Sequence, residues 1–166
     1  TAGKPVTGRM AITTANSDAI NTPIGGIIAV DIWLSDKSGK QEISLTSELT
    51  DLSLPLGQNE ILTLQAGKIS GAALFHGKNP EVTLKADFSN LAHPHLQARD
   101  AQISLGQDEK GMAYNFHILG ANIMPFELTG YGILSPPEIK GRYLSLGLDG
   151  TIDHKPVSLK QPLNLY

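Results

Sequence analysis

The chain of 166 residues contains no cysteine. Neither disulfides nor cysteine-ligated metal can therefore hold its fold together. Cytosolic proteins usually keep a thiol or two, whereas many bacterial periplasmic proteins have none. The absence of cysteine therefore favours a periplasmic or extracellular location, in the bacterial cell envelope.

Charged and aromatic residues are also scarce. Charged residues make up 17% of the chain, with a formal net charge of −3, and aromatic residues make up 5%. This charge provides neither the basic stripe of a nucleic-acid-binding protein nor a polybasic segment for anionic lipid head groups. The aromatic residues are too few for the two interfacial girdles of a spanning outer-membrane barrel. We expect no nucleic-acid partner and no membrane-spanning role.

Long hydrophobic runs are missing as well. The longest, IGGIIAVDIWL at 24–34, is broken by Asp31 and is far shorter than the roughly 20 residues of a spanning helix. Both of its alternating faces are largely apolar, which predicts a central or doubly covered strand, with Trp33 packed in the core. No signal peptide precedes Thr1, so we expect a mature or excised product.

What the sequence does contain is alternation of apolar and other residues with a period of two. Clear examples are the segments 82–88 and 112–118, and similar segments recur at the spacing of strands in all-β proteins. No segment has the apolar spacing and caps of an amphipathic helix. Seventeen glycines and ten prolines are spread along the chain, which indicates many turns and no linker. We predict a single all-β domain over residues 1–166, with about 10–12 mostly antiparallel strands.

Two local signals refine this prediction. Apolar residues occupy odd positions at 43–49 and even positions at 52–56, so a bulge or bend is expected near Thr50-Asp51. Alternating leucines at 144–148 are followed by Asp149-Gly150, a dipeptide that favours a hairpin turn. Three architectures with an apolar interior suit the whole pattern: a closed barrel, a two-sheet sandwich or a curled sheet with an open trough.

The strongest candidate for a metal site is LAHPHLQARD at 91–100, where His93 and His95 have ligand-like spacing. A catalytic zinc would need a further ligand, and Pro94 lacks the N–H that a paired strand requires. We therefore predict no metal site here but a connecting segment or sheet edge, with a change of strand direction.

Signals for catalysis are absent. The chain has no thiol and no G-x-S-x-G motif, and the Gly-Lys at 77–78 lacks the spacing of a phosphate-binding loop. Acidic pairs such as Asp149 and Asp153 lie near turn glycines, where aspartate has a structural role. We expect neither enzymatic activity nor a cofactor.

Small residues alternate with large aliphatic ones in two segments, GKISGAALF (67–75) and LTGYGIL (128–134). Small residues on an inner face leave room for a second sheet or for an apolar guest. For the second possibility, the candidate ligand-binding residues are Ile69, Ala73, Phe75, Leu128, Tyr131 and Ile133.

The segments 45–57, 66–91 and 128–152 combine short leucine and isoleucine alternations, flanking glycines, and the strings L-x-L-x-L and LDG. In this they resemble the β-repeat segments of bacterial envelope proteins of the AsmA/TamB/YdbH kind. The resemblance implies a curled sheet whose apolar trough passes lipid between membranes or assists outer-membrane assembly. It implies no catalytic residue. Those proteins are long and membrane-anchored, whereas these 166 residues are few by comparison and we expect no anchor among them.

We therefore expect a non-enzymatic envelope domain that binds lipid or another hydrophobic ligand in an apolar groove or barrel interior. An exposed edge strand could also take a protein partner. The alternative is a β-sandwich interaction module, namely an adhesin, a secretion-assembly subunit or a carbohydrate-binding domain.

Overall fold

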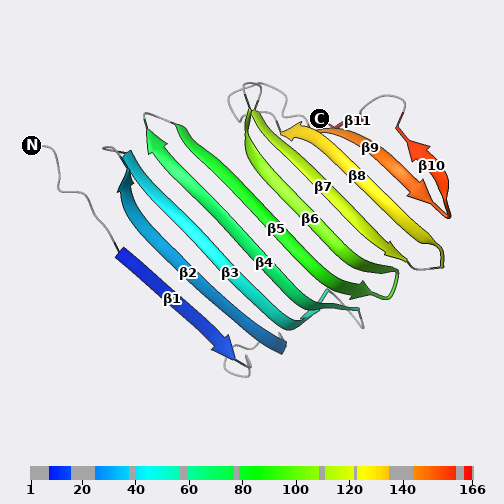
Figure 1. Cartoon of the computed structure of the whole chain (residues 1–166), viewed down its shortest axis with the longest axis horizontal. Coiled ribbons are helices and arrows are strands. Elements are labelled where there is room, and N and C mark those ends of the chain that lie inside the picture. Colours follow the sequence, from blue (N-terminus) through cyan, green and yellow to red (C-terminus); the bar gives the residue numbers. More distant parts are fainter. Residues whose placement is uncertain are drawn as a thin grey trace, which may run out of the picture.

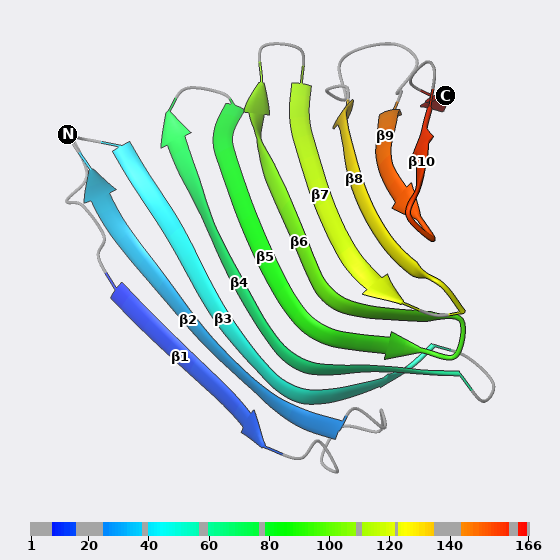
Figure 2. The ribbon, with the colours of Figure 1, turned by 45° about the vertical axis from the view of Figure 1, so that its right-hand side comes forward.

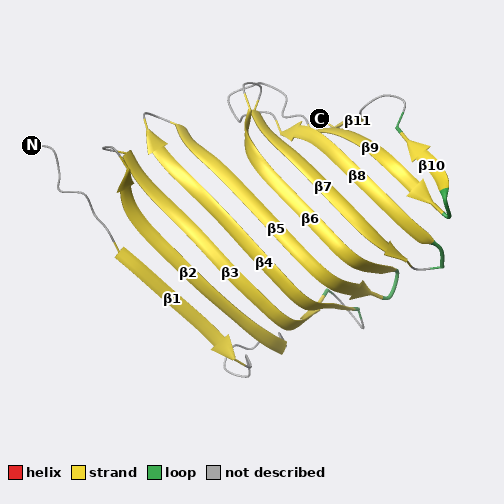
Figure 3. Ribbon diagram, viewed as in Figure 1, coloured by secondary structure: helices red, strands yellow, loops and turns green. Residues whose placement is uncertain are grey.

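A computed structural model describes residues 8–15, 25–37, 40–56, 60–76, 79–108, 111–121, 123–134, 144–159 and 163–165. These residues form eleven strands of one antiparallel sheet, and the described part contains no helix (Figure 3). The strands are β1 (Gly8–Ala15), β2 (Gly25–Lys37), β3 (Lys40–Pro55), β4 (Ile61–His76), β5 (Asn79–His93), β6 (Leu96–Asp108), β7 (Gly111–Ala121), β8 (Pro125–Leu134), β9 (Leu144–Ile152), β10 (Lys155–Ser158) and β11 (Leu163–Leu165).

Each strand from β1 to β10 pairs with its neighbours in the sequence, and β11 lies on the same edge of β9 as β10 (Figure 1). The prediction of an all-β fold with 10–12 antiparallel strands is confirmed. Of the three architectures, the curled sheet is found: the sheet does not close on itself, and the described residues form no second sheet. In the described part of the chain, no helix has the length and apolarity needed to cross a membrane.

The two faces of the sheet differ in chemistry, because side chains alternate along each strand and directly opposed residues share a face. One row across β2–β9 is apolar apart from one serine; it consists of Val30, Ser47, Ile69, Ala86, Ile103, Phe116, Gly130 and Leu148. The neighbouring row on the other face is mostly polar; it consists of Asp31, Thr46, Ser70, Lys85, Ser104, Asn115, Tyr131 and Gly147. We call these the inner and outer faces.

A crease crosses β3–β6, and in Figure 2 these strands turn a corner in their lower parts. In a regular strand, one outward-facing residue separates two inward-facing ones. At the crease, each of these strands has two such residues in succession; the pairs are Thr50-Asp51, Gln65-Ala66, Ser89-Asn90 and Arg99-Asp100. Asp51 and Asn90 have positive φ angles of 50° and 53°, a left-handed conformation that aspartate and asparagine tolerate better than most residues. A register shift between β2 and β3, beside Gly26, and another between β6 and β7, at Arg99, bound the crease.

The crease keeps the apolar side chains on one side of the sheet although their positions in the sequence change parity. On β3 the inner residues are odd up to Leu49 and even from Leu52. A Cβ placed on Gly67 would touch both Leu49 and Leu64, from the two sides of the crease. Side chains converge on the inside of a bend and spread on the outside, so the apolar face is the concave one. The bend predicted at Thr50-Asp51 is confirmed.

Burial is sparse and gathers at this corner. The buried apolar side chains of the described residues are Leu52, Leu64, Ala86, Ala98 and Ala101, all on the inner face near the crease. None of the described large side chains is completely buried. The accessible surface is 11743 Å², whereas a compact monomer of this mass would expose about 7,900 Å². The sheet therefore leaves uncovered much apolar surface that a compact domain would bury.

In β7–β9 aromatic rings lie over glycines of the neighbouring strand. Directly opposed pairs are Phe116 with Gly130, Tyr114 with Gly132, Tyr131 with Gly147, and Phe126 with Gly120. A Cβ added to any of these glycines would meet the opposing ring within 2.8 Å. The alternation of small and large residues in 128–134 is thus explained by packing within the sheet. It does not leave an empty slot at these positions.

Tyr114 also joins three strands. Its hydroxyl reaches over Gly132 of β8 and donates a hydrogen bond of 2.5 Å to the Ser145 carbonyl of β9. Burial raises the pKa of the Tyr114 hydroxyl, which keeps it protonated and able to donate. The Ser145 Oγ accepts a 2.9 Å hydrogen bond from the Ile133 amide. These contacts hold β8 to β9 where the regular ladder lapses between Tyr131 and Leu134.

The hairpin predicted at Asp149-Gly150 is wrong. Strand β9 runs through both residues to Ile152, and the turn to β10 is Asp153-His154, with φ angles of 50° and 60°. Such a turn needs positive φ at both central residues. Gly150 serves a different purpose, because a Cβ there would lie 2.0 Å from the Glu127 carbonyl oxygen of β8.

Candidate ligand-binding face

The inner corner is the most enclosed part of the apolar surface. The row on its short arm is entirely apolar and crosses β3–β8; it consists of Leu52, Leu64, Leu91, Ala98, Gly120 and Phe126. The facing row on the long arm includes Leu49, Gly67, Phe88 and Ala101. Large leucines thus line both arms, while glycine and alanine occupy part of the angle between them. The corner is a concave apolar strip that runs across the strands.

The inner face is free of charge over a wide area. From the row of Leu34 and Ile43 to the row of Leu52 and Leu64, its described positions on β2–β9 include no Asp, Glu, Lys or Arg. These rows extend roughly 25 Å along the strands and 33 Å across them. The resulting area of roughly 800 Å² exceeds the largest apolar patch of a typical monomer, about 300–600 Å². No described residue covers it.

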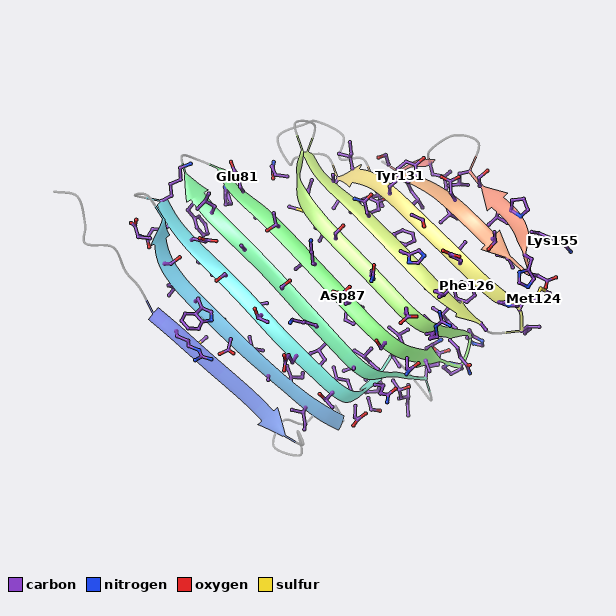
Figure 4. All side chains as sticks on the ribbon, viewed as in Figure 1. Glu81, Asp87, Met124, Phe126, Tyr131 and Lys155 are labelled. Atoms are coloured by element: carbon purple, nitrogen blue, oxygen red, sulfur yellow. The ribbon has the colours of Figure 1, made fainter. Side chains whose placement is uncertain are left out.

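The candidate ligand-binding residues do not all share this face. The inner face contains Ile69, Ala73 and Phe75 on β4, and Leu128 on β8, four strands away. Tyr131 and Ile133 lie on the opposite, outer face; Tyr131 is labelled on β8 in Figure 4. The six candidates therefore do not share one surface, and their role in ligand binding stays a prediction. Side chains along a regular strand alternate between the two faces, so residues an odd number of positions apart point to opposite faces. Tyr131 is three positions from Leu128 and one from Gly130, and it therefore lies on the face opposite to theirs.

The LAHPHLQARD stretch contains the turn Pro94-His95 between β5 and β6. The expected change of strand direction is confirmed, although the flanking residues belong to the two strands and not to a longer connection. His93 Nδ1 accepts a 3.3 Å hydrogen bond from the His95 amide, and its Nε2 lies 3.5 Å from Glu60. Among the described residues, no three potential metal ligands come together.

Trp33 does not pack in a core as predicted. Its side chain lies on the outer face and is 48% exposed. The Arg9 guanidinium stacks 4.7 Å from the ring centroid and forms an ion pair of 2.8 Å with Asp31. The apolar character of both faces of 24–34 therefore does not reflect a covering layer; β2 is the second strand from the edge of a single sheet.

The outer face has shallow polar depressions. One of about 400 Å³ spans β5–β8 and is lined by Lys85, Asp87, Gln102, Asn115 and His117, among others. Asp87 is labelled in Figure 4. His117 lies 3.0 Å from Glu127 on the neighbouring strand, so its ring already has a partner. This surface is open and solvated, and it offers no apolar enclosure.

The corner was only partly visible in the sequence. The slip at Thr50-Asp51 predicts a bend in β3, and equivalent slips occur in LQAG (64–67), FSNL (88–91) and ARDA (98–101). The register aligns all four. The signal that would have revealed the corner is the recurrence of two mostly polar residues between two inward-facing ones.

We compared the chain with protein-family models, with curated proteins and with solved structures, and none of the three comparisons gave a match. The resemblance to AsmA/TamB/YdbH-type segments stays a prediction.

Proposed function

We propose that the inner face binds the acyl chains of lipids or a similar hydrophobic ligand, with the exposed inner-face residues beside the corner of β3–β6 as its principal site. The observation that carries this proposal is the wide, charge-free apolar face that no described residue covers. Binding would remove this surface from water, which is favourable by about 25 cal/mol per Å² of apolar area.

The shape of the corner favours flexible chains over globular ligands. The corner crosses four hydrogen-bonded strands, so a chain lying along it would contact the sheet over roughly 15–20 Å. Leu52, Leu64 and Ala98 fill the angle itself, so a bound chain would lie against exposed inner-face residues beside it, such as Ile103. Tyr114 lies on the inner face away from the corner, and its hydroxyl is already bonded to the Ser145 carbonyl, so it is not a free polar anchor for a ligand. An extended hydrocarbon chain matches such a site better than a polar ligand does.

The proposal extends to location and chemistry. The absence of cysteine supports the cell envelope, periplasmic or extracellular, as the compartment, and a non-catalytic role is part of the proposal. The interaction-module alternative also stays a prediction, but its β-sandwich architecture is replaced by a single sheet.

Native mass spectrometry of delipidated protein, incubated with a defined diacyl phospholipid, tests the proposal. The decisive variant is Ile103→Asp, because Ile103 lies in the central inner row and is already 39% exposed, which limits damage to the fold. The matched control is Ser104→Asp, which places the same charge on the outer face of the same strand. We expect at least about a tenfold loss of lipid occupancy for Ile103→Asp, since an unpaired carboxylate against hydrocarbon is costly.

Ser104→Asp should retain wild-type occupancy, with both variants showing the wild-type circular dichroism spectrum. If the wild-type protein binds no lipid, or if the two variants lose binding equally, the inner face is not the binding surface and the proposal fails.

A further inference from the structure

In the described part of the chain, β1 forms one edge of the sheet, and its pairing with β2 is regular. All eight residues of β1 pair with β2 in one unbroken register, from Gly8 opposite Leu34 to Ala15 opposite Ile27. Among the described residues, none pairs with the other edge of β1. Alternate N–H and C=O groups of β1 therefore point away from the sheet, in the arrangement that accepts another strand.

The opposite edge is interrupted and protected. It consists of β10, with four residues, and β11, with three. Ser158 lies opposite Asp149, and Leu163 lies opposite Leu146. The edge chain thus advances five positions while β9 advances three, so β10 and β11 do not form one continuous paired strand. Lys155 and Pro156 lie in β10, and both residue types discourage strand addition, because proline has no N–H and lysine is charged. Of the two edges, β1 alone is a continuous pairing surface.

The charge on β1 is compensated within its own chain. Arg9 is the only charged residue of the strand, and its side chain is held by Asp31 and by the Trp33 ring of β2. A second β1 strand would therefore meet no unpaired charge. In an antiparallel pair centred at residue 12, Arg9 would oppose Ala15 of the other copy, which keeps the two arginines at opposite ends of the contact.

We propose that β1 pairs antiparallel with β1 of a second copy, forming a two-fold dimer with one continuous sheet. The symmetry axis of such a pair is perpendicular to the sheet, so both inner faces lie on the same side and form one larger apolar surface. Directly opposed residues of two paired strands point to the same face. The two-fold axis must therefore pass beside one residue of β1 that lies opposite the same residue of the other copy. This contact uses the same edge of both copies and closes on itself, whereas pairing of β1 with β10 would propagate into a filament.

Cysteine scanning tests the dimer, because the chain has no native cysteine. Met10, Ala11, Ile12 and Thr13 are each replaced by cysteine in separate variants. Opposed Cα atoms in an antiparallel pair lie about 4.5–5.5 Å apart, within the range that a disulfide spans. Under mild oxidation we expect covalent dimers to form mainly at one of the four positions, the axis residue, with a sharp decrease at the adjacent positions.

The matched control is Ser158→Cys, an exposed position on the β10 edge, which should crosslink only at the rate of random collision. Sedimentation of the wild-type chain should give the dimer mass. A monomer at all concentrations, or equal crosslinking at all four positions, would overturn the proposal. So would assemblies that grow with concentration together with rapid crosslinking of Ser158→Cys, which would identify head-to-tail pairing. These experiments contain no lipid, so a negative result would count against the dimer and not against the proposed ligand site.

Discussion

Strands β3–β6 and strands β7–β9 belong to the same sheet, but different contacts stabilise them. β3–β6 bend over the crease and place Leu52, Leu64 and Ala98 in its angle, where they are buried. Strands β7–β9 pair without a bulge, and among their described residues only Gly111, at the start of β7, has a positive φ angle. There the stabilising contacts are aromatic rings laid on glycines of the next strand.

The difference shows how a single layer can be held without a second one. A flat sheet exposes both faces, so it can gain burial only by folding on itself or by covering its own backbone. The crease does the first, since it brings Leu64 and Leu49 against the same glycine, Gly67. The rings of Phe116 and Tyr114 do the second, since they cover Gly130 and Gly132. Both solutions leave the rest of the inner face free for a ligand.

The largest expected effect concerns the aromatic–glycine contacts of β7–β9. Gly132→Ala should destabilise the protein by about 3 kcal/mol, because the added Cβ would lie 1.8 Å from the Ser145 carbonyl oxygen and 2.5 Å from the Tyr114 hydroxyl. Urea unfolding measures the change. The control is Gly106→Ala on β6, where nothing lies within 4 Å of the added atom; it should be neutral or stabilising by up to about 1 kcal/mol. Equal losses at both positions would contradict the role given to these contacts.

The next effect concerns the corner. Leu64→Ala should cost about 2–3 kcal/mol, because Leu64 is 6% exposed and packs at the crease. Ile103→Ala removes a similar side chain from the same face, but Ile103 is 39% exposed, so about 1 kcal/mol or less is expected. Chemical denaturation of both variants makes the comparison. A cost for Ile103→Ala that matches that of Leu64→Ala would mean that the corner is not the stabilising centre of this part of the sheet.

The smallest effect concerns the backbone of the crease. Asn90→Ala should cost about 1–2 kcal/mol, because alanine is strained at a φ of 53° and the hydrogen bond from Asn90 to Gln65 is lost. Asn90→Gly should recover most of this loss, since glycine adopts positive φ without strain.

In β7–β9 the corresponding change, Asn115→Ala, removes an exposed outer-face residue of regular backbone and should change stability by less than about 0.5 kcal/mol. Thermal unfolding of the three variants distinguishes these outcomes. A neutral Asn90→Ala would remove the argument that left-handed residues shape the crease.

Local chemistry made the strands predictable, and long-range register limited the rest. The period-two alternation in 82–88 and 112–118 depends only on neighbouring residues, so it indicated the strands and their inner faces correctly. Tyr131 and Ile133 were grouped with inner-face residues because both faces of the segment 128–134 contain large apolar or aromatic residues, and only pairing with β7 and β9 assigns each residue to a side.

Trp33 and Gly150 illustrate the same limit. A tryptophan among aliphatic residues is usually buried, but here the ring lies opposite Arg9 across the strand pair, and no local pattern encodes that partner. Asp-Gly favours a tight turn, yet Gly150 was required by the approach of Glu127 from β8. The crease was in principle readable from the four recurrent slips, but their alignment follows only from the register.

The order of the strands has a consequence for how the molecule assembles. Because every strand from β1 to β10 pairs only with strands close to it in the sequence, nearly all of its contacts close short loops, and the sheet behaves as a one-dimensional array of hairpins. Such an array has a low contact order for an all-β protein, so it can form quickly by adding one strand at a time. It should also open from the edge that ends in β10, with amide hydrogens of β10 exchanging before those of β4 and β5.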